Sequence, residues 1–66
     1  MDIQLNGERR SVAETWTIAD LLTDLNVESR YCAVERNREV VPREQHATCR
    51  LRPGDHLEIV TLVGGG

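Results

Sequence analysis

The chain has 66 residues, close to the lower size limit for one independently folding domain, and a domain of this size buries only about 60% of its unfolded surface. The formal net charge is −3 and all eight basic residues are arginines, so no basic excess exists to neutralise a phosphate backbone, and nucleic-acid binding is disfavoured. No apolar stretch approaches the roughly 20 residues that span a bilayer, and the N-terminus lacks the regions of a signal peptide, so we expect a cytoplasmic protein outside the membrane.

The N-terminal segment predicts a β-hairpin. Residues 1–5 alternate between apolar and polar side chains, which is the period of a strand with one buried face. Asn6-Gly7 follows and favours a two-residue type I′ turn. Residues 8–13 form a weaker return strand, in which Val12 is the one clearly apolar side chain. The turn therefore supports the hairpin more strongly than the second strand does.

The clearest element is a helix. Thr17 is placed to cap its N-terminus, with Asp20 at the acidic position of a capping box, and Asn26 is a plausible C-terminal stop. An apolar stripe with the spacing i, i+3, i+4 and i+7 follows the cap and predicts one face against a core. Its members are Ile18, Leu21, Leu22 and Leu25.

Trp16 precedes the predicted N-cap and has two interpretations. It can pack on Leu21 as the outer member of a hydrophobic staple, or it can anchor a binding partner. We favour the staple or a place in the core, because both positions of the motif are filled.

The middle of the chain predicts a second hairpin. Residues 31–36 read as a strand with Cys32 and Val34 on one face, and residues 39–41 read as a further short strand. Asn37-Arg38 makes the turn between them. In a reducing compartment the two cysteines, Cys32 and Cys49, are expected to be small buried apolar residues.

A linking segment precedes the last strand. Pro42 ends the preceding strand or marks a sheet edge, because proline cannot donate to a ladder. Residues 43–46 are expected to form an irregular or single helical turn, and Leu51 returns to the core. Residues 52–55 carry Pro and Gly at the central positions of a type II turn.

The final predicted strand covers residues 56–63, and its pattern changes along its length. The first half alternates, whereas the second half places apolar groups on both faces through Val60, Leu62 and Val63. A central strand covered on both sides has such a run, and so does an exposed patch to which a partner docks. We favour docking, since a chain with a single helix has little with which to cover a second sheet face.

The element order predicts an α+β fold in which one helix crosses a small mixed sheet. We expect one domain over residues 1–63 and a glycine tail over 64–66. Gly64, Gly65 and Gly66 have no side chains to pack, and each offers the slimmest cross-section a residue can have. A linker or a cloning remnant would also be glycine-rich, but neither explains a tail directly after an apolar strand. We therefore expect the chain to present the α-carboxylate of Gly66 as its reactive group.

Other sites find less support. A Cys-His dyad and a zinc site are both conceivable on paper, but only one tight ligand pair, His46-x-x-Cys49, is present where structural zinc sites typically have two, and so small a domain has little room for a cleft. We therefore expect no metal and no catalytic side chain. The residues concerned are Cys32, His46, Cys49 and His56. Three arginines close in sequence could bind a partner's carboxylates, although ordinary surface positions explain them as well: Arg36, Arg38 and Arg43.

Four segments resemble the ThiS family, the small sulfur carriers of thiamine biosynthesis, and the resemblance covers the whole chain. The segments are Ala33-Val34-Glu35-Arg36-Asn37, Val40-Val41-Pro42-Arg43, Pro53-Gly54-Asp55-His56-Leu57-Glu58-Ile59-Val60 and Val63-Gly64-Gly65-Gly66. The diglycine end alone is shared with ubiquitin-like proteins and with MoaD, the molybdopterin-synthase carrier. The stretch over residues 37–43 favours ThiS.

The resemblance implies a β-grasp fold with the final strand central in the sheet. It also implies that a ThiF-like adenylating enzyme uses Mg-ATP to activate the Gly66 carboxylate. Sulfur from a cysteine desulfurase or an equivalent donor then gives a thiocarboxylate, which the thiazole synthase ThiG consumes. The carrier implied in this way is not an enzyme and binds no cofactor of its own. Gly64 and Gly65 would thread the partner's active site.

Two alternatives to this function remain open. One is a MoaD-like carrier that serves another pathway, and the other is a ubiquitin-like modifier conjugated through Gly66. The absence of lysine argues against chains built on the protein's own side chains. It does not exclude conjugation to other proteins.

Overall fold

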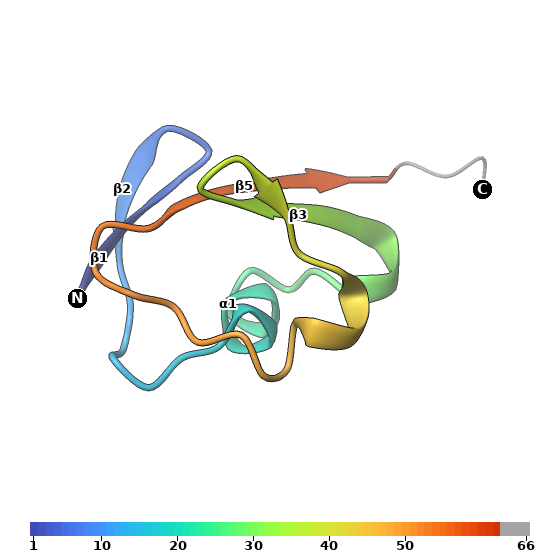
Figure 1. Cartoon of the computed structure of the whole chain (residues 1–66), viewed down its shortest axis with the longest axis horizontal. Coiled ribbons are helices and arrows are strands. Elements are labelled where there is room, and N and C mark those ends of the chain that lie inside the picture. The colour runs from blue at the N-terminus through green and yellow to red at the C-terminus, as the bar shows by residue number, and fades with distance from the viewer. Residues whose placement is uncertain (63–66) are drawn as a thin grey trace.

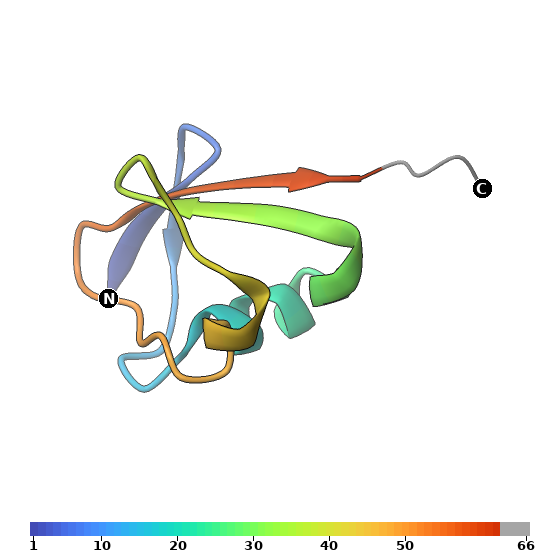
Figure 2. The ribbon, with the colours of Figure 1, turned by 45° about the vertical axis from the view of Figure 1, so that its right-hand side comes forward.

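The computed structural model describes residues 1–62, which form a mixed sheet with one helix lying across one of its faces (Figures 1 and 2). Within these residues the sheet has five strands in the order β2-β1-β5-β3-β4. This is the predicted α+β arrangement. None of the helices among residues 1–62 has the length and apolar character needed to cross a bilayer.

The first hairpin forms as predicted. β1 (Asp2–Leu5) and β2 (Glu8–Ser11) pair antiparallel along their whole length. Asn6 has a φ of 50° and Gly7 a φ of 85°, and a type I′ turn requires positive φ at both central residues. Asparagine and glycine adopt this conformation at lower cost than other residues do, which explains the sharp reversal at this point.

The helix α1 (Ile18–Asp24) begins with the predicted capping box. The Asp20 N–H donates to the Thr17 hydroxyl oxygen over 3.2 Å, and the Thr17 N–H donates to the Asp20 carboxylate over 2.9 Å. Two backbone N–H groups at the helix start, which have no partner within the helix, are thereby satisfied.

The helix ends just before Asn26, the predicted stop, with Leu25 as its C-cap. Asn26 has a φ of 60°, in the left-handed region. Its N–H donates to the Thr23 carbonyl over 3.0 Å, and the Val27 N–H donates to the Leu22 carbonyl over 2.9 Å. This pair of bonds is a Schellman motif, which satisfies the last carbonyls of the helix and directs the chain away from its axis.

The second hairpin joins β3 (Cys32–Arg36) to β4 (Glu39–Val40), with positive φ at both turn residues, Asn37 and Arg38. Two boundaries differ from the predicted ones. Tyr31 belongs to a 3₁₀ turn (Ser29–Tyr31) because its N–H bonds back to the Glu28 carbonyl, and Val41 lies just beyond β4. The segment after Pro42 is a single 3₁₀ turn (Arg43–Gln45), in agreement with the sequence.

The strand β5 (His56–Thr61) occupies the centre of the sheet. It runs parallel to β1 and antiparallel to β3. The predicted type II turn precedes it: Gly54 has a φ of 80°, and the Asp55 N–H donates to the Arg52 carbonyl over 3.1 Å. The C-terminal strand is therefore the one that holds the two hairpins together.

The core lies between the sheet and α1, and Trp16 is partly buried against it, which agrees with a core position for this side chain. Cys32 is buried and Cys49 is partly buried against the same core, as expected of small apolar residues. The buried apolar members are Ile3, Val12, Ile18, Leu21, Leu22, Cys32, Val34, Val41, Leu51, Leu57 and Ile59.

Candidate functional site: the outer sheet face and the end of β5

The two faces of β5 differ sharply in exposure. Leu57 and Ile59 point toward α1 and are buried, whereas Val60 is 59% exposed on the opposite face. Leu62, just after the strand, is 54% exposed. A strand covered on both faces is therefore the wrong explanation of the apolar run: β5 is central in the sheet, but in the described chain the face opposite the helix is uncovered.

Further apolar side chains share this outer face, which we define as the sheet face opposite α1. Val40 is 70% exposed and lies opposite Glu35 in the β3–β4 pair. Val60 lies opposite Ala33 in the β3–β5 pair. Tyr31, in the 3₁₀ turn before β3, is exposed as well, and its carbonyl accepts from the Leu62 N–H over 2.7 Å. Exposed apolar side chains that gather on one face are a candidate surface for binding another molecule.

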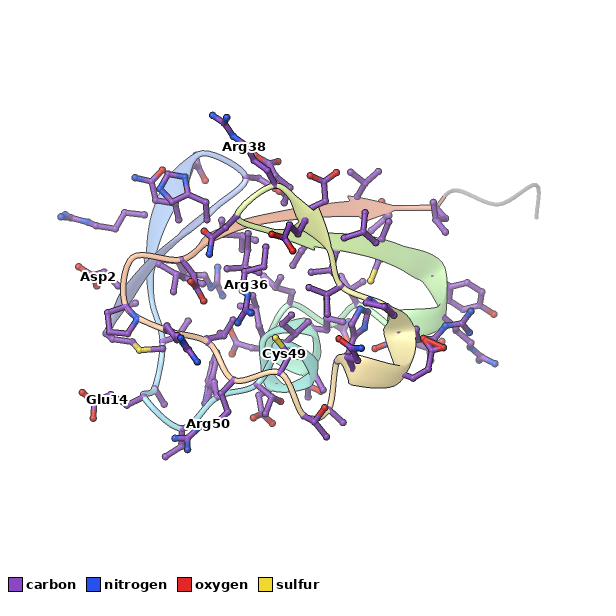
Figure 3. All side chains as sticks on the ribbon, in the orientation of Figure 1. Asp2, Glu14, Arg36, Arg38, Cys49 and Arg50 are labelled. Carbon is purple, nitrogen blue, oxygen red and sulfur yellow. The ribbon has the colours of Figure 1, made fainter. Side chains whose placement is uncertain are left out.

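A polar hollow of about 420 Å³ lies beside these apolar residues. Glu35 and Glu58 stand directly opposite each other on β3 and β5, an arrangement that like charges disfavour. Figure 3 shows Arg38 pointing outward from the β3–β4 turn, at the rim of the sheet. The lining residues are Glu35, Asn37, Arg38, His56 and Glu58.

The arginines do not act as one group. Arg36 points beneath the sheet (Figure 3), where its guanidinium donates to the Arg50 carbonyl over 3.1 Å and approaches the Asp55 carboxylate at 3.9 Å. Arg38 lies at the hollow described above. Arg43 begins the 3₁₀ turn after Pro42. The structure therefore separates the three arginines that the sequence placed close together.

The cysteines and histidines also serve separate purposes. His46 is buried, with Nδ1 3.0 Å from the Ser29 hydroxyl and Nε2 3.1 Å from the Val41 carbonyl, so both ring nitrogens have partners within the fold. Burial raises the pKa of the Cys32 thiol, which disfavours the nucleophilic thiolate. Among residues 1–62 no three His, Cys, Asp or Glu side chains gather into a group that could hold a metal.

Sequence reasoning missed two residues that position β5. The Asn6 side chain bonds to the backbone of Ile59 on one edge of the strand, and the buried Asp55 carboxylate joins Arg52 and Asn37 at its start. A turn asparagine carries no signal for a partner 53 positions away. The pattern showed the turns but not where their side chains point.

The remaining site residues, Val63, Gly64, Gly65 and Gly66, lie outside the described residues, as does the predicted domain boundary after residue 63. The structure shows the strand that leads toward them and the two anchors nearest its end, at Ile59 and Leu62.

A mixed sheet crossed by one helix, with the C-terminal strand at its centre, defines the chain as a β-grasp domain. The structure of a thiamine biosynthesis protein (ThiS) from Geobacter metallireducens superposes with a TM-score of 0.84 at 35% identity, and all of both chains is covered. The model of the ThiS family matches residues 3–66. The chain belongs to the ThiS family.

Two relatives show how this domain occurs elsewhere. The Sulfur carrier protein ThiS of Bacillus subtilis is 40% identical over 65 residues, which covers 97% of this chain and 98% of the relative. A protein named Thiazole synthase from Paramagnetospirillum magneticum is 46% identical over 66 residues. There the match covers 100% of this chain but 20% of the relative, so the chain spans one fifth of that longer protein.

Proposed function

We propose that this protein carries sulfur for thiazole formation in thiamine biosynthesis, as a thiocarboxylate on Gly66. The observation that supports the proposal best is the uncovered apolar outer face of β5, the strand that leads toward Gly64-Gly65-Gly66 in a chain of the ThiS family. A core needs no such surface, whereas a carrier that is handed between enzymes does.

The chemistry requires activation of a poor electrophile. A carboxylate anion repels nucleophiles and has no good leaving group. In the first proposed step a Gly66 carboxylate oxygen attacks the α-phosphorus of Mg-ATP and pyrophosphate leaves, which gives an acyl-adenylate. In the second step sulfur at the level of hydrosulfide attacks the acyl carbon and AMP leaves. If a persulfide from a cysteine desulfurase delivers the sulfur, its terminal sulfur attacks the acyl carbon and gives an acyl disulfide as AMP leaves. A thiol then attacks the other sulfur of this disulfide, which releases the thiocarboxylate and forms a new disulfide.

In this proposal the chain contributes presentation rather than catalysis. Val60, Leu62 and Val63 dock a ThiF-like adenylating enzyme, while Gly64 and Gly65 pass through its active-site channel without side chains that would clash. Placing the carboxylate in line with the α-phosphate removes much of the entropic cost of the reaction. The partner binds the Mg-ATP, and the carrier needs no cofactor of its own.

A thiazole synthase of the ThiG type is the proposed consumer of the sulfur. Two relatives named Thiazole synthase, from Paramagnetospirillum magneticum and Magnetococcus marinus, contain a segment similar to this entire chain within a protein about five times as long. Joining the two parts in one protein keeps the donor at high effective concentration beside the enzyme that uses it. Here the same pairing would arise by docking.

Intact mass spectrometry tests the proposal. The full chain is incubated with its adenylating enzyme, Mg-ATP and sulfide, and we expect the mass increase produced when one oxygen is replaced by sulfur. The starting mass also establishes whether Gly66 ends the mature protein, which the chemistry requires. No mass change under conditions where the enzyme hydrolyses ATP would contradict the proposal. Adducts on the lysines of other proteins would support a ubiquitin-like modifier instead.

A further inference from the structure

The Asn6 side chain replaces a strand at the edge of β5. β1 pairs with β5 at two positions, the second of them opposite Leu57, and the Asn6 N–H adds a bond to the Leu57 carbonyl over 2.8 Å. The backbone then turns into the hairpin. Its side chain continues the ladder: Oδ1 accepts from the Ile59 N–H over 2.8 Å, and Nδ2 donates to the Ile59 carbonyl over 3.2 Å.

A carboxamide can do this because it has the same donor and acceptor as a peptide group. Asn6 thus provides the next rung where the β1 backbone no longer can, and the two polar groups of Ile59 are satisfied without a neighbouring strand. The left-handed φ of 50° at Asn6 fits the same residue, since asparagine tolerates that region. One side chain therefore ends the hairpin strand and extends the ladder.

Ile59 is the last point at which the described part of β5 is held from both edges. On the other edge β3 continues beside it, and the final bond there joins the Leu62 N–H to the Tyr31 carbonyl. Gly66 follows Ile59 by seven residues, which span roughly 23 Å when extended. A change in the direction of β5 at Ile59 therefore changes the direction in which the described part of the strand points toward Gly66.

We infer that Asn6 is a positioning residue for sulfur loading: its bonds to Ile59 set the direction in which β5 delivers the Gly66 carboxylate to the adenylating enzyme. The inference rests on the proposed function. It assigns a role in loading to a residue near the N-terminus, which is far from the tail in the sequence and lies outside the docking face. Since Asn6 does not touch the outer-face residues Val60 and Leu62 through its bonds, its effect falls on the reaction rate rather than on docking.

Asn37 provides a matched control. It is also the first residue of a two-residue turn with positive φ, and its side chain also makes two bonds: Oδ1 accepts from the His56 N–H over 2.9 Å, and Nδ2 donates to the Asp55 carboxylate over 3.1 Å. It acts at the start of the strand, however, ten residues from Gly66. Comparing variants of Asn6 and Asn37 therefore separates the effect of losing a turn asparagine from the effect of losing the bonds to Ile59.

The experiment compares Asn6→Gly and Asn37→Gly in the full-length protein. Glycine retains the positive φ, so both turns are kept. Hydrogen exchange measured by NMR should show faster exchange of the Ile59 amide hydrogen in the first variant and of the His56 amide hydrogen in the second. With the adenylating enzyme, Mg-ATP and sulfide, Asn6→Gly should lower the loading rate at saturating carrier about tenfold or more. Its KM should change less than about twofold, and Asn37→Gly should load like the wild type.

Asn6→Asp covers the case in which Asn6→Gly does not fold. Aspartate tolerates the turn and keeps the acceptor for the Ile59 N–H but loses the donor to its carbonyl, so we expect a rate between wild type and Asn6→Gly. Wild-type loading by any variant with a faster Ile59 amide would overturn the inference, and so would an equal loss in Asn37→Gly or an unchanged Ile59 amide in Asn6→Gly. If the wild type itself is not loaded, the proposed function fails first and the inference with it.

Discussion

Toward its C-terminal end, β5 places apolar side chains on both faces of the sheet, and the two faces differ in what surrounds these side chains. On the inner face Leu57 and Ile59 are buried beneath α1, while on the outer face Val60 and Leu62 are exposed although they belong to the same stretch of chain. Burial of the inner side chains stabilises the protein when it folds. The outer side chains would contribute a comparable free energy only when another molecule covers them. The difference shows that one face of β5 stabilises the fold, and it leaves the other face available for the docking proposed above.

Removing a leucine from each face should show the largest contrast. Leu57→Ala leaves a cavity in the core, and we expect it to lower the free energy of unfolding by about 2–5 kcal/mol. Leu62→Ala removes the same atoms from an exposed position, and we expect a change of about 0.5 kcal/mol or less. Urea denaturation followed by circular dichroism measures both. A comparable loss in the two variants would show that the outer face also supports the fold.

The inner side of the sheet is also held by a buried carboxylate. Asp55 accepts from the Arg52 N–H over 2.9 Å and from Asn37 Nδ2 over 3.1 Å. Asp55→Ala leaves these donors without their partner, and we expect a loss of about 1–3 kcal/mol in the free energy of unfolding. Asp2→Ala removes an exposed carboxylate and is the control, with little change expected. If both variants unfold alike, the buried bonds contribute no more than surface charge does.

Much of the fold could be predicted because its signals are local. The capping box at Thr17, the helix stop at Asn26 and the positive φ at Asn6 each depend on neighbours within a few residues, and all were confirmed. The central place of β5 followed from the resemblance rather than from periodicity. Local chemistry therefore identified the elements, and the resemblance placed the last of them at the centre of the sheet.

The site was less predictable because burial depends on what the rest of the chain can cover. The sequence alone left Val60 and Leu62 open to two explanations, and only the position of α1 on one face decides between them. The bond from Asn6 to Ile59 joins residues 53 positions apart, and no local pattern encodes it. Such contacts depend on tertiary structure, so sequence reasoning could predict the turn at Asn6 but not the bonds between its side chain and β5.

Cys32 tests whether the inner face is closed near the end of β5, since it lies opposite Thr61. Burial raises the pKa of its thiol, so in Cys49→Ser protein we expect slower alkylation by iodoacetamide at pH 8 than for the unfolded chain. The neutral thiol contributes stability that is fully present below the ordinary thiol pKa and is lost as pH rises through the raised value. Equal alkylation rates in folded and unfolded protein would show that this end of the core is open.

A charge on the outer face should affect stability little and binding strongly, which makes it the most informative change for function. Val60→Asp should change the free energy of unfolding by about 0.5 kcal/mol or less, because the side chain is exposed, yet weaken the complex with the adenylating enzyme about tenfold or more by placing a carboxylate in an apolar contact. Val40→Asp adds the same charge to the same face on β4 and should weaken the complex less, since it lies farther from the strand that leads to Gly66. Titration calorimetry with the purified enzyme measures both affinities. An unfolded Val60→Asp protein would show a structural role, and unchanged binding would place the docking surface elsewhere.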